Sequence, residues 1–561
     1  MKRFTNKQRI GSVVAAVAAC AALAGCGSSS SSSSGSSGGT APASTAVLTV
    51  ESSQQNQITQ VFNPFITSSG ASLLGATSLI YEPLMQANVI KPGKYYPFLA
   101  TGYKWSHGGN TITFTIRQGV KWSNGAPLTA KDVAFTYEML KDHADVNTVG
   151  LDLSSVQSSA NKVTLSFPSP QYSNFQNIAG QVYIVPESVW SKVSDPGKFD
   201  DADPVGTGPY VLKNFTSQGI TLSANPHYWG GPPKVGTVEF PTYASANAAL
   251  SALQTNQLTF GGNFITGVQK VYVAGNPDHK VWFPPTNTNS LEPNLDKWPT
   301  NQLPVRKAIS LAIDRNAISE QGEGGLEPPA QNASGLTLPI FQRYLSPSVE
   351  GNKLDPTANA AAAEQVLQQA GYTKDSAGYY ALNGKEVKLD ITDPASYSDY
   401  AADDAIVAKD LKQAGINATF VGQSVDAWSA DIADGDYQLT MHWSQTSVSP
   451  YQLYNNWLNS SLATASNRAG NYEGLKDPTI DAQLKKLASA PTASLQASDV
   501  APIEQYVATN LPIIPTVYGV VFDEYNTSKF SGWPDASNEY ESGSPNAPTN
   551  EVVILHLKPT G

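Results

Sequence analysis

The residue types that most often carry out chemistry are sparse and scattered in this chain of 561 residues. Six histidines stand singly, and no pair has the i, i+4 spacing that places two imidazole rings on one metal ion. The chain also lacks the G-x-x-x-x-G-K-[ST] loop that cradles phosphates and the G-x-G-x-x-G motif of dinucleotide sites. The pattern therefore predicts no metal, no cofactor and no catalytic group.

Two short segments have residue types that bind ions in other contexts. Residues 206–209 read Gly-Thr-Gly-Pro, but proline lacks the backbone N–H that a phosphate cradle needs, so a turn is favoured. Residues 200–203 read Asp-Asp-Ala-Asp without the spacing and final Glu of an EF-hand calcium loop, which favours a solvated loop. One enzymatic interpretation stays open: a secreted hydrolase, such as a glycosidase, whose two catalytic carboxylates lie far apart in the sequence.

The beginning of the chain differs in composition from the rest. A basic start is followed at 10–24 by an apolar stretch that is too short and too rich in Ala and Gly for a membrane-spanning helix. The closing Leu-Ala-Gly-Cys at 23–26 resembles the lipobox of bacterial lipoproteins, in which the cysteine is acylated and becomes the new N-terminus. Residues 1–25 are therefore predicted to be a signal peptide and Cys26 a lipid-bearing residue. An ordinary secretory signal with a chance cysteine is the alternative.

Cysteine usage restricts the chemistry of the mature domain. The chain has two cysteines, and Cys20 lies inside the segment that signal cleavage removes. A mature chain with only an acylated Cys26 has no disulfide, no cysteine nucleophile and no thiolate metal site. The following segment at 26–45 is mostly Ser and Gly, which predicts a flexible tether with a root-mean-square span of about 20 Å.

Composition excludes several further functions. The chain has 35 Lys and Arg against 46 Asp and Glu, a formal charge of -11, and no basic run beyond the first ten residues. This balance argues against nucleic acid as a partner and against direct attraction to an anionic membrane. A content of 40% apolar residues with ten Trp and 25 Tyr predicts a packed globular domain.

Hydrophobic periodicity indicates mixed α and β structure. Alternation predicts strands at 111–116, 162–167, 210–215, 220–224, 416–421 and 437–443. One helix is predicted to start at Asp355-Pro356 as N-cap and first helical residue and to end at Gly371. A second helix is predicted at 403–414 with Gly415 as its C-cap. The alternation of helices and strands predicts an α/β fold.

Several ordered segments carry a family resemblance. They are FTIRQGVKWSNGAPLTAKDVAFTYEML at 114–140, GTGPYVL at 206–212, NPHYWGGPPK at 225–234, VRKAISLAIDRNAI at 305–318, EQVLQQAGY at 364–372, DLKQAGINATFV at 410–421 and a Trp at 443. This set resembles the extracellular solute-binding proteins of ABC importers, in the peptide/nickel class called family 5. The lipobox and tether agree with it, because such receptors are lipid-anchored beside their permease in cells without an outer membrane.

The resemblance implies a two-lobed, clamshell α/β fold of the periplasmic-binding-protein type, with an extra subdomain in the first lobe. The implied first lobe combines 46–80, 203–287 and 525–561, the extra subdomain is 81–202, and the second lobe is 288–524. Hinge closure would trap a solute between the lobes. The implied protein is a monomer and not an enzyme. It would sit on the outer face of the cytoplasmic membrane and deliver an oligopeptide or a similar polar oligomer to ABC permease subunits.

The resemblance also points to ligand-binding residues. Peptide receptors of this family use an aspartate shortly after a tryptophan to pair with the α-amino group, but residues 443–450 read Trp-Ser-Gln-Thr-Ser-Val-Ser-Pro. A buried ammonium without a counter-charge is costly, so the missing acid favours a neutral polar ligand, and an oligosaccharide is the alternative ligand. The implied ligand contacts are Trp443, Gln445 and Thr446, with Phe264 facing them from the first lobe.

Other large side chains are predicted to be structural. Trp122, Tyr228 and Trp229 would anchor loops onto a sheet. Arg306, Asp314 and Arg315 would form a solvated or ion-paired helix face. Tyr451, Tyr454 and Trp457 could stack on a sugar, although a core position is favoured for Tyr454 and Trp457.

Overall fold

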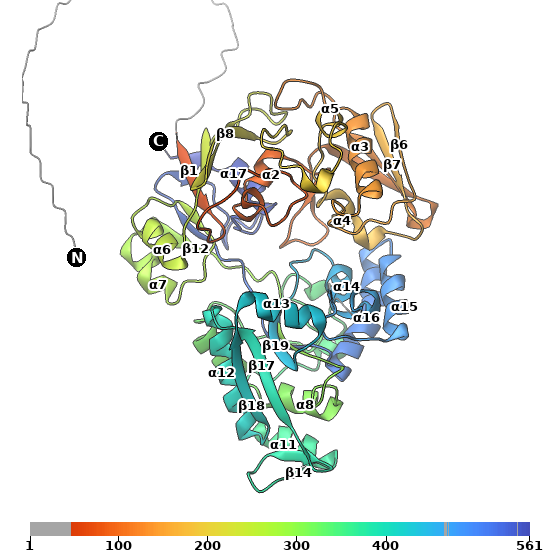
Figure 1. Cartoon of the computed structure of the whole chain (residues 1–561), viewed down its shortest axis with the longest axis vertical. Helices are drawn as coiled ribbons and strands as arrows, with labels where there is room; N and C mark the ends of the chain where they lie inside the picture. Colours follow the sequence, from red (N-terminus) through yellow and green to blue (C-terminus); the bar gives the residue numbers. More distant parts are fainter. Residues whose placement is uncertain (1–45, 465–467, 469, 547, 561) are drawn as a thin grey trace, which may run out of the picture. The chain divides into compact units, whose positions relative to one another are not determined.

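Three large sheets organise the described part of the chain, which the computed structural model gives as residues 46–464, 468, 470–546 and 548–560. The predicted signal peptide, Cys26 and the tether lie outside these residues. The sheets have seven, four and five strands, and Figure 1 labels many of their elements. Among the described residues no helix is both long and apolar enough to cross a membrane.

The seven-stranded sheet is built from distant parts of the chain. Its order is β12-β21-β11-β1-β10-β9-β8, and β1 pairs in parallel with both β10 and β11. The strands are β1 Val47–Glu51, β8 Tyr210–Thr216, β9 Gly219–Ala224, β10 Thr237–Pro241, β11 Phe260–Gly261, β12 His279–Val281 and β21 Glu524–Asn526. The first lobe, as we use the term, is this sheet with its helices, which include α2 Thr77–Ile80, α6 Ala246–Gln254 and α17 Thr549–His556.

The four-stranded sheet belongs to the predicted extra subdomain. It consists of β4 Ala100–Ser106, β5 Thr111–Ile116, β7 Lys162–Ser166 and β6 Ser155–Ser159, in that order. Every second residue of β5 is buried, so the strand has the inward face that its alternation predicts. The helix α3 Ala130–Asp142 begins after Thr129, whose side chain accepts from Lys131 N while Asp132 bonds back to Thr129 N.

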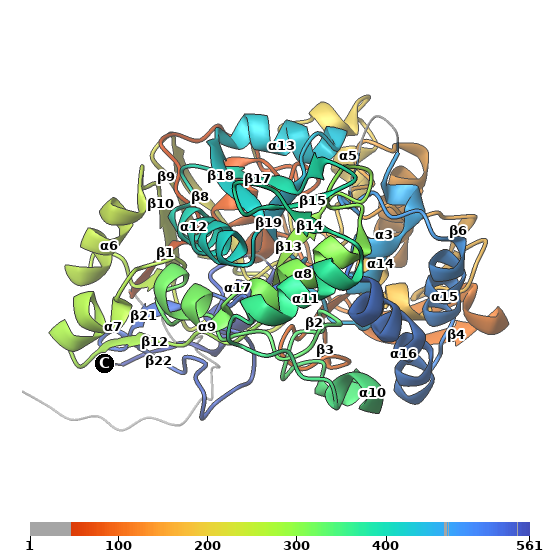
Figure 2. The ribbon, with the colours of Figure 1, turned by 90° about the horizontal axis from the view of Figure 1, so that it is seen from below.

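The second lobe, as we use the term, contains the five-stranded sheet β18-β17-β19-β13-β20. Its strands are β13 Asn289–Pro293, β17 Lys388–Pro394, β18 Asn417–Gln423, β19 Leu439–Trp443 and β20 Ile514–Val517. Helices α8 Leu303–Ala312, α11 Ala360–Gln369 and α12 Ser398–Gln413 share one apolar core with this sheet and lie over it in Figure 2. A separate core holds α14 Pro450–Leu458, α15 Pro478–Ala488 and α16 Ala493–Asn510 together.

The predicted strands are confirmed to within two residues at each end, but both predicted helix starts are wrong. Helix α11 begins at Ala360, where Asn359 Oδ1 accepts from Ala362 N at 3.0 Å. Asp355 instead accepts from Thr357 N at 3.0 Å in a local turn. Helix α12 begins at Ser398, five residues before the prediction, and Asp403 and Asp404 are buried inside the helix.

The predicted solvated or ion-paired face around α8 is also wrong. Arg306 and Arg315 are buried, and their guanidinium groups donate to backbone carbonyls rather than to solvent. Arg306 Nη1 donates to Thr300 O at 2.8 Å, and Arg315 Nε donates to Pro515 O at 2.8 Å. A guanidinium group has five N–H donors in one plane and can therefore bond several backbone carbonyl groups. Carbonyl groups at helix and strand ends need such donors because they lack other partners.

Loop anchors behave as predicted in the resembling segments. Trp122 is fully packed in the core, and Trp229 Nε1 donates to both carboxylate oxygens of Glu82 at 2.9 and 3.0 Å. The turn at 206–209 passes so close to the end of α2 that a Cβ atom on Gly206 would collide with the Ile80 carbonyl. The acidic run at 200–203, predicted as a solvated loop, is partly buried: Asp201 is buried and accepts a hydrogen bond from the Tyr81 hydroxyl.

Candidate binding cleft

Two antiparallel segments join the lobes. Residues 282–289 lead from β12 to β13, and residues 517–524 return from β20 to β21. They bond to each other through Trp282 N to Asp523 O at 3.2 Å, Thr286 N to Gly519 O at 2.9 Å and Val521 N to Pro284 O at 3.1 Å. The two crossings therefore form a paired ribbon, which is where a relative motion of the lobes would be absorbed.

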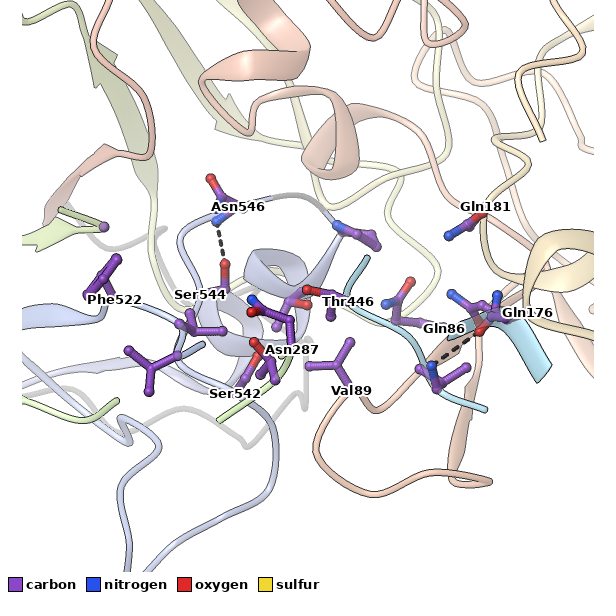
Figure 3. Close-up of a pocket in the computed structure, with 18 residues that line it drawn as sticks. Gln86, Val89, Gln176, Gln181, Asn287, Thr446, Phe522, Ser542, Ser544 and Asn546 are labelled. Atoms are coloured by element: carbon purple, nitrogen blue, oxygen red, sulfur yellow. Dashed lines mark hydrogen bonds between the residues drawn. The ribbon is translucent and has the colours of Figure 1, made fainter. Parts of the chain in front are cut away.

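A first chamber of about 440 Å³ lies against this ribbon and is shown in Figure 3. Its walls come from the extra subdomain, the first lobe, the ribbon and the second lobe. They are Gln86, Val89, Gln176, Gln181, Gly262, Thr286, Asn287, Thr446, Val448, Gln452, Val520, Val521, Phe522, Ser542, Ser544, Asn546, Pro548 and Thr549. None of these side chains is ionisable, and amides and hydroxyls provide the polar surface.

Several polar atoms of the first chamber have no protein partner among the described residues. They are Gln86 Oε1, Gln176 Oε1, Thr286 Oγ1, Asn287 Oδ1 and Ser542 Oγ. In Figure 3, Asn287, Thr446 and Ser542 lie near the middle of the chamber, while Gln86 and Gln176 lie at one side. Each of these atoms has almost no exposed surface, and a buried polar atom without a hydrogen bond costs about 1–3 kcal/mol, so the chamber wall carries unused hydrogen-bonding capacity just beneath its surface.

A second chamber of about 490 Å³ shares Gly262, Asn287, Val520 and Phe522 with the first. The two chambers therefore adjoin along the ribbon. Aromatic and acidic side chains distinguish the second chamber. Its other walls are Ser52, Ser53, Gln54, Ala246, Asn263, Phe264, Asn289, Glu327, Ser396, Tyr397, Ser398, Asp399, Tyr400 and Trp443.

Trp443 is the outer member of an aromatic stack in the second lobe. Its ring lies 4.5 Å from the His442 ring at an angle of 14°, and His442 stacks in turn on Trp428 at 5.6 Å. Burial lowers the pKa of His442 to about 4, so this ring is neutral near pH 7. Trp443 is 40% exposed although it ends a sheet strand, so part of its ring is open to the second chamber.

The acids of the second chamber have no basic neighbour in its wall. Burial, followed by the charge of Glu323, raises the pKa of Glu327 well above its usual range. Burial also raises the pKa of Asp399. Behind them, Glu323 and Asp403 form a buried carboxyl pair in which burial raises both pKa values. Neighbouring carboxyl groups disfavour each other's ionisation, so these groups retain protons at pH values above the ordinary carboxyl pKa.

The four predicted ligand contacts lie in different places. Trp443 and Phe264 line the second chamber, Thr446 lines the first, and Gln445 is exposed and lines neither. Their contact with a ligand stays a prediction. Tyr454 and Trp457 are core residues, as favoured, and the half-buried Tyr451 lines neither chamber.

Sequence reasoning missed the acids that accompany Trp443. Asp399 comes from the start of α12, and Glu327 comes from a loop more than a hundred residues before Trp443. Residues 444–447, directly after Trp443, have only hydroxyl and amide side chains, so this stretch contains no acid. No pattern in the sequence links these three positions, because the sheet and helix of the second lobe bring them together.

On the far side of the first chamber, the extra subdomain bonds to the second lobe. Gln452 Nε2 donates to Asn177 Oδ1 at 2.9 Å, Ser173 Oγ to Leu487 O at 2.9 Å, and Arg343 Nη2 to Pro92 O at 2.7 Å. These bonds hold the lobes together at a second place besides the ribbon. Across the described residues, no group of three or more His, Cys, Asp or Glu is arranged to hold a metal ion.

The paired ribbon between two sheet-containing lobes, with a polar cleft along it, can be compared with known proteins. Residues 94–464 match the model of the bacterial extracellular solute-binding proteins, family 5. The chain belongs to this family. Members of this family are named for binding a solute.

Two relatives found by sequence agree with this assignment. A probable peptide-binding protein of Agrobacterium fabrum is 23% identical over 529 residues, covering 84% of each chain. The nickel-binding periplasmic protein of Escherichia coli is 24% identical over 427 residues, covering 73% of this chain and 78% of that protein.

The fold of this family-5 protein is shared with solved structures. A periplasmic oligopeptide-binding protein of an ABC transporter from Thermotoga maritima superposes with a TM-score of 0.84 at 22% identity, covering 92% of this chain and 99% of that one. A structure of the same Thermotoga protein bound to mannohexaose gives a TM-score of 0.78, also at 22% identity, covering 92% and 98%. The two-lobed clamshell predicted from the sequence is confirmed.

Proposed function

We propose that this protein is the substrate-binding component of an ABC importer and that it captures a polar oligomer without anionic groups in the cleft between its lobes. An uncharged oligosaccharide fits the cleft best. The observation that carries this choice is the lining of the two chambers: neither has a Lys, Arg or His, and the first has no ionisable side chain. A carboxylate or phosphate buried there would lack a counter-charge, which costs several kcal/mol.

The aromatic surfaces of the second chamber support the same choice. Trp443 is open to it from the second lobe and Phe264 from the first, and Phe264 packs edge-on against Phe522 at 5.7 Å. Exposed rings of this kind offer apolar faces, while the amides and hydroxyls of the first chamber offer hydrogen bonds. One Thermotoga neighbour was solved with a mannohexaose.

An oligopeptide is the second candidate solute, and Asp399 favours it. Its carboxyl group lies in the wall of the second chamber without a basic partner there, so it could pair with a peptide's ammonium group. The relatives whose names mention peptides support this alternative.

Thermal shift with matched hexamers tests the proposed solute. We expect mannohexaose or cellohexaose to raise the melting temperature of the protein and hexaalanine to leave it unchanged, since a ligand at 100 times its Kd adds about 2.7 kcal/mol. N-acetylated hexaalanine is the control, because it removes the ammonium group alone. Stabilisation by free hexaalanine, but by neither the acetylated peptide nor the sugars, would establish the peptide alternative.

We further propose that a lipid on Cys26 anchors the protein to the outer face of the cytoplasmic membrane, as a monomer beside its permease. The lipobox at 23–26 supports this proposal. Cys26→Ser is expected to move the protein from the detergent phase to the aqueous phase and into the medium, because two acyl chains provide the stable anchor. Cys20→Ser is the matched control and should not change partitioning. A Cys26→Ser protein that stays in the membrane would contradict the anchor.

The proposal includes the division of the chain into working parts. The first lobe would comprise 46–80, 203–287 and 525–561, with the extra subdomain at 81–202 and the second lobe at 288–524. The paired crossings at 282–289 and 517–524 support boundaries at these positions, because they are the segments between the two large sheets.

A further inference from the structure

Glu327 occupies a place where the cleft and both interlobe crossings meet. Its carboxyl Oε1 accepts from the backbone N–H of Val520 at 3.1 Å, and its Oε2 lies 2.6 Å from Nδ2 of Asn289. Val520 belongs to one crossing, and Asn289 lies at the end of the other, where β13 begins. Both Glu327 and Asn289 line the second chamber while only 4% of each residue is exposed.

The backbone around Glu327 is fixed independently of its carboxyl group. Ser319 Oγ donates to the Glu327 carbonyl at 2.6 Å, and Tyr518 N donates to Pro328 O at 2.8 Å. The carboxyl group is therefore held at one position beside Asn289, and a change in its protonation acts on neighbouring side chains without moving the loop.

The groups that face Glu327 are acidic or phenolic. They are Glu323 from the preceding turn, and Asp399, Tyr400 and Asp403 from α12. None supplies a positive charge, and burial adds to the preference for the protonated form. The 2.6 Å separation between Asn289 Nδ2 and Glu327 Oε2 puts the two side chains in direct hydrogen-bond contact.

Asn289 has one amide end without a partner. Its Nδ2 faces Glu327, while its Oδ1 has no hydrogen bond within the described part of the chain. The two ends of an amide have nearly the same shape but opposite polarity, so a half-turn of the side chain exchanges a donor for an acceptor at almost no steric cost. Which end faces Glu327 depends on whether the carboxyl group accepts or donates the hydrogen bond between them.

We propose that Glu327 and Asn289 form a proton-controlled selector in the second chamber. With Glu327 ionised, Asn289 gives its N–H to the carboxylate and keeps its oxygen on the buried side, where it has no protein partner. With Glu327 protonated, the O–H of Glu327 donates to Asn289 Oδ1, and the amide N–H₂ takes that side instead. The wall of the second chamber thereby holds a donor at low pH and an acceptor at high pH just beneath its surface. As a determinant of solute binding, this selector rests on the proposed function.

Side-chain NMR of the unliganded protein tests the selector directly. In protein labelled with ¹³C at the Glu carboxyls and ¹⁵N at the Asn amides, Glu327→Gln and Asn289→Ala identify the two resonances. We expect the Glu327 carboxyl to titrate well above the usual value of 4.5 and the Asn289 amide to shift over the same pH range. In Glu327→Gln the Asn289 amide should not respond to pH, whereas in the exposed control Glu320→Gln it should titrate as in the wild type.

Two outcomes would overturn the selector. One is a Glu327 titration near the ordinary value, and the other is an Asn289 amide that does not follow the Glu327 titration. If Glu327→Gln does not fold, the wild-type spectra still decide, because Asn289→Ala identifies the amide resonance. An Asn289 amide that shifts at a pH where no carboxyl titrates above 4.5 would contradict the proposal. The NMR measurement uses the protein without a solute. If none of the hexamers binds in the thermal-shift experiment, that result counts against the proposed function and not against the selector.

Discussion

The melting temperature of this protein is expected to be highest near pH 5 and to fall steadily as the pH rises to 8. The cause is a set of buried carboxyl groups with few basic partners. Burial raises the pKa of Glu524 to about 8, and burial raises the pKa of Glu541 to about 8 as well, from an ordinary 4.5. Both groups are fully enclosed.

The direction follows from proton binding in the two states. Between pH 4.5 and 8 the folded protein keeps a proton on Glu524 and Glu541, while the unfolded chain has released both. Their stabilisation is complete below the unfolded pKa and is lost as the pH rises through the folded pKa. Each group removes about 1.4 kcal/mol from the free energy of unfolding for every pH unit in this window.

Calorimetry from pH 4.5 to 8 measures this effect. Glu541→Gln keeps the shape of a protonated carboxyl and should lessen the pH dependence, with a gain in stability relative to wild type at pH 8. Glu138→Gln, on the exposed face of α3, is the matched control and should leave the profile unchanged. A wild-type protein that melts at a higher temperature at pH 8 than at pH 5 would contradict the prediction.

Replacement of Trp443 by Ala is expected to weaken solute binding by about 2–3 kcal/mol while the empty protein keeps its melting temperature. The ring is 40% exposed and offers its outer face to the second chamber, so its removal leaves little buried volume empty. The solute, in contrast, is expected to lose an apolar surface in the wall of the second chamber. Titration calorimetry with the hexamer that stabilises the wild type, together with a melting curve, measures both quantities.

Trp457 is the matched control, since it is a tryptophan in the same lobe but in the core. It is almost fully buried, and its Nε1 donates to Glu292 Oε1 at 3.2 Å. Trp457→Ala should cost about 3–5 kcal/mol of stability through the cavity and the lost bond. If Trp443→Ala instead lowers the melting temperature and leaves affinity unchanged, Trp443 is a structural residue and the second chamber is not the binding site.

The sequence alone determined the features that depend on neighbouring residues. The strand at 111–116 follows from the alternation of polar and apolar residues. Ordered segments along the chain were enough to identify the family and its two-lobed fold. In each case the deciding interactions lie within a few residues, or in a pattern that can be compared position by position.

Only the tertiary structure decided the chemistry of the cleft. Asp399 and Glu327 lie far from Trp443 in the chain, and the fold of the second lobe places all three in the wall of one chamber. Arg315 shows the same limit, because its charge predicted solvent or an ion pair, whereas the fold buries it against backbone carbonyls. A side chain's charge and polarity are fixed by its type, but its partners are set by contacts between distant segments, which local patterns do not encode.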